Sequence, residues 1–289
     1  MSDEQGEPVQ PHPKPNDWSD LGARILSAVV LIPIGLGAAY FGGPWLAGAA
    51  GAAVVAMSYE WARMSEPKAY AAPFWLSLAG ALGAVMIASW GRLWLAMAWL
   101  CGCALISAFR RKSLAGVLET AGGAIYVGAP AAVFLWLRDR SEEGLVTILT
   151  LFIVIWTTDI FAYFGGKLIG GPRIARDLSP NKTWSGIITG TAAGGVAGFA
   201  CGEMFAPSAA HEAAWIAIGL VIAFTGLMGD LFESFLKRRF GVKDASRFIP
   251  GHGGVLDRID GLMMATLLTG AILAFAPDLS AWLVGSARP

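Results

Sequence analysis

The feature of this sequence that most limits its fold is a series of nine apolar runs, each about 20 residues long. A helix needs roughly 20 apolar residues to cross a bilayer. Only 15% of the residues are charged, against about 25% in soluble proteins. The sequence therefore predicts an all-α, polytopic integral membrane protein with about nine transmembrane helices. The runs cover residues 22–42, 44–63, 70–90, 92–108, 114–137, 144–166, 183–202, 211–236 and 258–276.

The distribution of Lys and Arg predicts the orientation of these helices. With nine spans and the N-terminus inside, 17 of the 21 Lys and Arg residues fall on the inner side and four on the outer side. Cytoplasmic segments carry such an excess of positive charge. The N-terminus is therefore expected in the cytoplasm, with the chain in the cell inner (plasma) membrane. Residues 1–20 are polar and Pro-rich, lack the pattern of a signal peptide, and are expected to form a disordered cytoplasmic tail.

Five acidic residues lie where an apolar sequence should avoid them. A charged group inside a bilayer costs roughly 2.5–3.5 kcal/mol on insertion scales. Asp159 lies near the end of the sixth run, Asp230 and Glu233 near the end of the eighth, and Asp257 and Asp260 open the ninth. On the predicted topology all five lie at the cytoplasmic ends of their helices. The sequence thus predicts one acidic site at the depth of the inner leaflet.

The spacing of these acids adds geometry to the prediction. Asp257 and Asp260 are three residues apart and share one helix face, as do Asp230 and Glu233. Carboxylates without Cys or clustered His suit a hard cation, and Mg²⁺ is the usual choice where phosphates also bind. A metal-binding site at these acids is therefore predicted.

A purely structural role for the acidic residues is the alternative to a metal site. The acids would then pair with nearby arginines such as Arg238 and Arg258. Glu60, Glu119, Glu203 and Glu212 lie close to run ends, where solvation at the membrane interface is expected to account for them.

Glycines recur every four residues in the seventh run, at Gly186, Gly190, Gly194 and Gly198. Such stripes of small residues let two helices approach closely. The stripe predicts tight helix packing, and it is one reason to expect a homodimer.

The predicted inner loops are rich in cations next to glycine turns. They read KLIGGPRIARDLSPNK at 167–182 and KRRFGVKDASRFIPGHGGVLDR at 237–258. Cations close to carboxylates are what a polyphosphate–Mg²⁺ complex requires. Glycines let backbone N–H groups approach a phosphate, and His252 among them could donate to one. The loops therefore favour a nucleotide or phosphate ligand.

The stretch at 234–260, SFLKRRFGVKDASRFIPGHGGVLDRID, resembles the signature of the phosphatidate cytidylyltransferases, or CDP-diacylglycerol synthases. Asp159 and the segment SPNKTW at 179–184 are also similar to that family, although members commonly have an acidic residue where this chain has Ser185. The resemblance covers about the last 140 residues. It divides the chain into N-terminal transmembrane helices at 21–140 and a C-terminal catalytic transmembrane region at 141–289.

The resemblance implies transfer of the cytidylyl group of CTP to phosphatidate, giving CDP-diacylglycerol and pyrophosphate. It implies Mg²⁺ as cofactor, with room for a second, monovalent cation. The implied metal ligands are Asp230, Asp257 and Asp260, and the implied catalytic residues are these three and Lys237. The implied substrate-binding residues are Lys182, Arg238, Lys243, Arg247, His252, Arg258, Ser234 and Asp159. Expected partners are CTP, phosphatidate, membrane lipids and a second copy of the chain, with no nucleic acid.

Two other functions would use similar groups. A lipid or ion transporter would explain intramembrane acids and cationic loops, but the acidic constellation occurs only in the second half of the chain, without an inverted repeat. A CTP-dependent lipid kinase would bind the same substrates and transfer the γ-phosphoryl group instead.

Overall fold

The computed structural model describes residues 18–65, 72–109, 111, 113–140, 143–175, 178–207, 212–246, 253–276 and 278–279. Nine α-helices lie within these residues, as the apolar runs predict. They are α1 (Trp18–Phe41), α2 (Gly43–Ser65), α3 (Ala72–Ala88), α4 (Leu93–Ala108), α5 (Leu114–Asp139), α6 (Gly144–Leu168), α7 (Trp184–Phe205), α8 (Glu212–Arg239) and α9 (Leu256–Phe275). Helix α1 includes the last three residues of the predicted tail, and residues 1–17 lie outside the described part.

A membrane location is consistent with the length and the surface of the helices. Four of the described helices, α5, α6, α8 and α9, are long and apolar enough to cross a membrane. Large apolar side chains are exposed on several helices, including Trp75, Ile188 and Val196, of which 58%, 64% and 68% of the surface is accessible. Extended apolar surface of this kind marks contact with lipid or another protein.

A two-stranded antiparallel hairpin departs from the all-α prediction. It consists of β1 (Arg173–Ala175) and β2 (Ser179–Thr183), with Arg173 opposite Thr183 and Ala175 opposite Ser179. The hairpin forms most of the basic segment between α6 and α7. Its last residue caps α7, because the Thr183 hydroxyl oxygen accepts a hydrogen bond from the backbone N–H of Gly186 at 3.2 Å.

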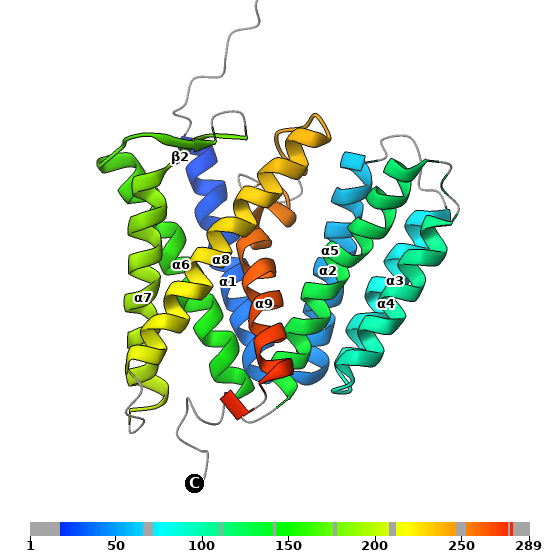
Figure 1. Ribbon diagram of the computed structural model, residues 1–289, viewed down its shortest axis with the longest axis horizontal. Helices are drawn as coiled ribbons and strands as arrows, with labels where there is room; N and C mark the ends of the chain where they lie inside the picture. Colours follow the sequence, from blue (N-terminus) through cyan, green and yellow to red (C-terminus); the bar gives the residue numbers. More distant parts are fainter. Residues whose placement is uncertain are drawn as a thin grey trace, which may run out of the picture.

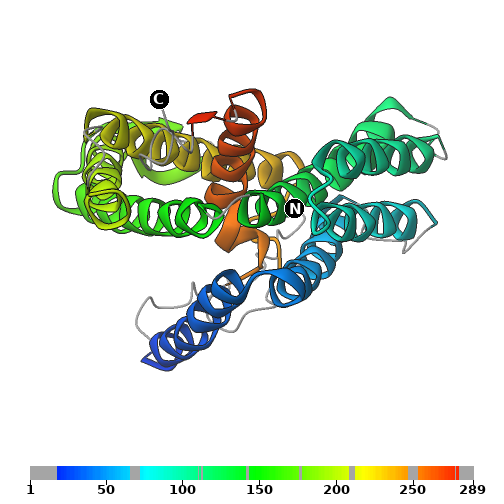
Figure 2. The ribbon, with the colours of Figure 1, turned by 90° about the horizontal axis from the view of Figure 1, so that it is seen from below.

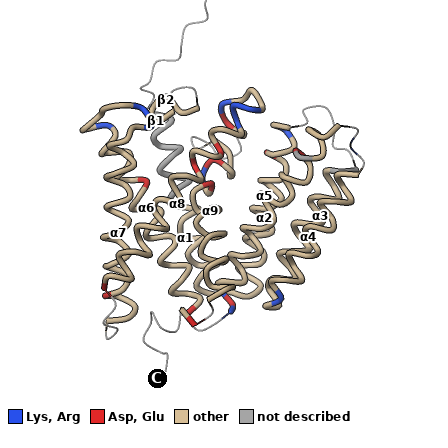
Figure 3. The backbone as a smooth tube through the Cα atoms, viewed as in Figure 1, with Lys and Arg blue, Asp and Glu red and all other residues tan. Residues whose placement is uncertain are grey.

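The helices form two groups with α9 between them (Figures 1 and 2). Helices α6, α7 and α8 pack together in one group, and α3, α4 and α5 in the other, while α9 contacts α5, α6 and α8. The hairpin, the end of α8 and the start of α9 lie at the same end of the molecule (Figure 1). Most of the described Lys and Arg residues lie at this end too (Figure 3). We call it the cationic end.

The glycine stripe of α7 packs this helix between α6 and α8. A Cβ atom at Gly190 would lie 2.8 Å from the Cβ of Ala162 on α6, and one at Gly194 would overlap the Cβ of Ala223 on α8. The predicted tight packing is confirmed. The stripe is occupied by helices of the same chain, so it does not supply a dimer interface.

Replacing Gly198 with Ala is expected to destabilise the protein. The new Cβ would overlap the backbone oxygen of Trp215, which cannot move without shifting α8. Such overpacking costs about 1–3 kcal/mol, and a lower midpoint of thermal unfolding in detergent would show it. Gly102→Ala on α4 is the matched control, because nothing lies within 4 Å of its added Cβ. Equal unfolding midpoints for the two variants would contradict this packing.

Candidate active site

Three carboxylates meet near the cationic end, where α8 crosses the start of α9. Asp230 and Glu233 come from α8 and Asp260 from α9, and one oxygen of each lies within 4.8 Å of the others. Asp230 and Glu233 point the same way because they are three residues apart on one helix. We refer to Asp230, Glu233 and Asp260 as the acid cluster.

The acid cluster fits a divalent cation. The side chain of Glu233 is 2% exposed, and its Oε1 is buried without a hydrogen-bond donor among the described residues. Buried carboxylates repel one another unless a cation or a proton lies between them. Oxygen ligands of this type are preferred by Mg²⁺ and Ca²⁺. The chemistry of the described residues therefore accommodates a hard metal ion at this place.

Lys182 borders the acid cluster from the hairpin. Its Nζ on β2 lies 2.6 Å from Asp230 Oδ2, which brings the hairpin against α8. Arg238 reinforces this contact, because its Nε donates to the carbonyl oxygen of Leu178 at 3.3 Å. The hairpin that follows α6 in sequence thus places a lysine next to an acid of α8.

Lys237 links α8 to α9. Its Nζ lies 3.3 Å from Glu233 Oε2 and 2.8 Å from Asp257 Oδ1. Asp257 also accepts hydrogen bonds from the backbone N–H groups of Ala245, at 3.3 Å, and Gly254, at 2.8 Å. Asp257 therefore lies beside the acid cluster, with its carboxylate bound by Lys237 and two amides. Glu233 is the third acid of the cluster, and Asp257, which the family resemblance implies as a metal ligand, lies next to it.

The remaining predicted residues lie around this centre. Asp159 on α6 is within electrostatic range of Asp230, Lys182 and Arg258. Arg258 is exposed at the start of α9.

Two more predicted residues belong to α8 and the segment after it. Ser234 is half-buried one residue after Glu233, and Lys243 is exposed in the segment after α8. The predicted phosphate ligands Arg247 and His252 lie outside the described residues. The ion pairs described for these acids are with Lys182 and Lys237.

Two residues near the site were missed by the sequence analysis. Glu60 was expected to be solvated at the interface, and this was wrong: it is fully buried and bonded to the start of α9. Tyr126 on α5 has a buried hydroxyl without a partner among the described residues, within electrostatic range of the acid cluster. The only feature of the sequence that could have indicated a role for Glu60 or Tyr126 is that each is a polar residue inside an apolar run.

Ser185, at the position where the resemblance implies an acidic residue, has a local structural role. Its hydroxyl donates to the carbonyl oxygen of Gly170 and lies 2.8 Å from the Thr183 hydroxyl oxygen. It therefore ties the segment before the hairpin to the start of α7.

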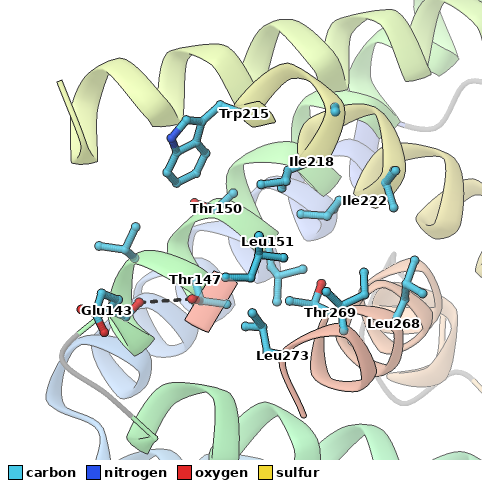
Figure 4. A pocket seen from close by; sticks show the side chains of 15 residues that line it. Glu143, Thr147, Thr150, Leu151, Trp215, Ile218, Ile222, Leu268, Thr269 and Leu273 are labelled. Carbon is cyan, nitrogen blue, oxygen red and sulfur yellow. Dashed lines mark hydrogen bonds between the residues drawn. The ribbon is translucent and has the colours of Figure 1, made fainter. Parts of the chain in front are cut away.

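A cavity of about 220 Å³ lies at the opposite end of the molecule, between α6, α8 and α9 (Figure 4). Its lining is mostly apolar and includes Thr147, Trp215, Ile222 and Leu273. No residue of the acid cluster lines it. The candidate active site is therefore the acid cluster with its lysines, and not this cavity.

Comparison with known proteins identifies the family of this chain. The model of the cytidylyltransferase family matches residues 22–276. A phosphatidate cytidylyltransferase from Brucella abortus biovar 1 (strain 9-941) is 41% identical over 273 residues, covering 91% of this chain and 98% of the relative. One from Brucella suis biovar 1 is 41% identical over 90% of this chain and 96% of the relative. One from Rickettsia bellii is 38% identical over 53% of this chain and 66% of the relative. A family match over residues 22–276, together with relatives 41% identical over about nine-tenths of the chain, means that the chain belongs to the cytidylyltransferase family.

Proposed function

We propose that this protein transfers the cytidylyl group of CTP to phosphatidate, giving CDP-diacylglycerol and pyrophosphate in phospholipid biosynthesis. The observation that carries the proposal is the acid cluster bordered by Lys182 and Lys237, in a chain that belongs to the cytidylyltransferase family. The names of its relatives supply the substrates.

We propose Mg²⁺ as the cofactor, held by Asp230 and Asp260, which the sequence prediction and the acid cluster have in common. Glu233 is the third acid within reach. Asp257, the third ligand implied by the family resemblance, stays a prediction, since a metal ion would compete with Lys237 for its carboxylate. When bound, Mg²⁺ would neutralise the phosphate charges of CTP and shield them from the incoming anion.

The reaction itself needs little acid–base chemistry from the protein. A phosphate monoester has its second pKa near 6, so phosphatidate is largely a dianion at neutral pH. Its oxygen attacks the α-phosphorus of CTP, and pyrophosphate leaves. The task of the protein is to align the two anions and to neutralise their charge. Lys182 and Lys237 already lie against the acids, and we propose that they contact phosphate oxygens in the substrate complex.

The arrangement at the cationic end suits one soluble and one lipid substrate. We propose nine membrane spans with the N-terminus in the cytoplasm, in the inner membrane, and the catalytic region at 141–289. The cationic end would then face the cytoplasm, where CTP is available, while the acyl chains of phosphatidate stay in the bilayer. A homodimer and a second, monovalent cation rest on the family resemblance alone.

The decisive experiment follows the label of CTP with purified protein, phosphatidate and Mg²⁺. The proposal expects the α-phosphorus label to enter the lipid fraction and the γ-phosphorus label to leave as pyrophosphate. Entry of the γ-label into lipid would identify a lipid kinase. If neither label enters the lipid while the protein remains folded, the proposed reaction is wrong and transport becomes the leading alternative.

A further inference from the structure

The first half of the chain contributes a buried carboxylate close to the proposed active site. Glu60 lies on α2, five residues before the end of that helix, and no part of it is exposed. A carboxylate is almost never fully buried unless it is paired or hydrogen-bonded. Its partners therefore indicate what it does.

Glu60 accepts hydrogen bonds from the segment that leads into α9. The backbone N–H of Val255 donates to Oε1 at 2.8 Å, and that of Leu256 donates to Oε2 at 2.8 Å. The Ser246 hydroxyl donates to Oε1 at 2.6 Å. Both oxygens of the carboxylate are thus occupied by donors that lie 186 to 196 residues away in sequence.

Glu60 acts as the N-terminal cap that α9 lacks in its own sequence. The first N–H groups of a helix have no partner within it, and a Ser, Thr, Asp or Asn before the first turn usually accepts from them. In α9 this position is Val255, whose side chain has no acceptor. A carboxylate at the start of a helix also interacts favourably with the helix dipole.

The helix end that Glu60 holds carries the acids of the site. Asp257 and Asp260 lie one and four residues after Leu256, in the first turns of α9. The position of Leu256 relative to α2 therefore sets where these carboxylates lie relative to Asp230 and Glu233 on α8. The contact is close, because a Cβ at Gly254 would lie 2.8 Å from Glu60 Oε1.

We infer that Glu60 is a positioning residue for cytidylyl transfer: it anchors the start of α9 so that Asp260 meets the acids of α8. It touches neither metal nor substrate in this role. The inference rests on the proposed function for its catalytic consequence, but the anchoring itself can be measured without any activity. It also makes the catalytic region at 141–289 dependent on α2.

The test compares Glu60→Gln with a matched control, Glu203→Gln. Gln keeps the size of the side chain but turns an N–H₂ group toward N–H donors, so at least one of the three hydrogen bonds is lost. Glu203 is an exposed carboxylate near the end of α7, and this end lies opposite the cationic end of the molecule (Figure 1). Ser246→Ala removes one donor and leaves the carboxylate in place, so it remains informative if Glu60→Gln fails to fold.

Two readouts are needed, both on the full-length protein in detergent. The first is amide hydrogen exchange of the segment at 253–261, which should be faster in Glu60→Gln while the segments of α6 and α7 are unchanged. The second is the Mg²⁺ dependence of cytidylyl transfer. Substitutions behind a metal site typically cost roughly 10–100-fold in metal affinity or activity. We therefore expect the half-saturating Mg²⁺ concentration to rise by that factor, with a smaller rise for Ser246→Ala.

The outcomes separate this inference from the proposed function. Normal exchange at 253–261, or an unchanged Mg²⁺ dependence and turnover in Glu60→Gln, would overturn the positioning role. A wild-type protein that transfers no cytidylyl group would instead overturn the proposed function, while faster exchange in Glu60→Gln would still support the anchoring of α9. An equal effect of Glu203→Gln would mean that loss of any carboxylate suffices, which also contradicts the inference.

Discussion

Asp260→Asn is expected to lower the rate of cytidylyl transfer by roughly 10²–10³-fold, the usual cost of losing one group that stabilises transition-state charge. Asp260 is the one member of the acid cluster that α9 supplies, and the nearby carboxylate of Asp257 on the same helix is already paired with Lys237. Asn has the same shape, and its amide oxygen can still accept the hydrogen bond that Asp260 Oδ1 receives from the Gly261 N–H at 2.8 Å. The backbone of α9 should therefore stay in place.

The stability of this variant should not fall with its activity. Removing one of three neighbouring negative charges relieves repulsion, so the midpoint of thermal unfolding without Mg²⁺ should equal or exceed that of the wild type. The measurements are transfer of the α-label of CTP and thermal unfolding in detergent. Asp278→Asn is the matched control, because Asp278 is exposed after α9, at the other end of the molecule. Near-normal turnover in Asp260→Asn would remove this residue from the proposed metal site.

Lys237→Met is expected to destabilise the protein by roughly 3–5 kcal/mol, the usual cost of leaving buried charges unpaired. Lys237 is 14% exposed and lies between Glu233 and Asp257, whose side chains are only 2% and 9% exposed. Met fills a similar volume, so the loss would come from the two carboxylates that no longer face a cation. Denaturant or thermal unfolding measures the effect, and activity should fall with it.

A double variant tests the physical reason for this loss. If unpaired negative charge is the cause, Lys237→Met combined with Glu233→Gln should be more stable than Lys237→Met alone, because one of the two carboxylates is gone. Lys167→Met is the control: Lys167 is exposed on α6 and bonds the Tyr163 hydroxyl at 3.3 Å, so its loss should cost little. Equal destabilisation by both lysine substitutions would contradict the bridging role of Lys237.

Much of the fold could be predicted because the signals are local. The apolar run at 144–166 became α6 at Gly144–Leu168, and the run at 258–276 became α9 at Leu256–Phe275. The glycine stripe predicted a close helix contact because its four-residue period is also a local signal, contained within one helix. The hairpin was not predicted, because its strands of three and five residues have no periodicity long enough to recognise.

The candidate site could be predicted in part. A charged group in an apolar run costs free energy to bury, whichever helices the run packs against. Asp230 and Asp260 could therefore be recognised in the sequence. Which of Glu233 and Asp257 lies within the acid cluster could not be predicted. Both are acids on the correct helices, and only the packing of α8 against α9 places Glu233 with the cluster and leaves Asp257 on Lys237.

By itself, then, the sequence predicted about nine helices, an acidic site formed by the ends of the sixth, eighth and ninth of them, and the family resemblance that names a reaction. Hydrophobic period, burial cost and motif spacing are properties of short stretches of chain, so no folded structure is needed to recognise them. The tertiary structure alone decided that Glu60 caps α9 and that the α7 stripe is used within the chain. Both depend on which surfaces, distant in sequence, come into contact. The residues around Glu60 in the sequence do not indicate that its partner, Leu256, lies 196 residues away.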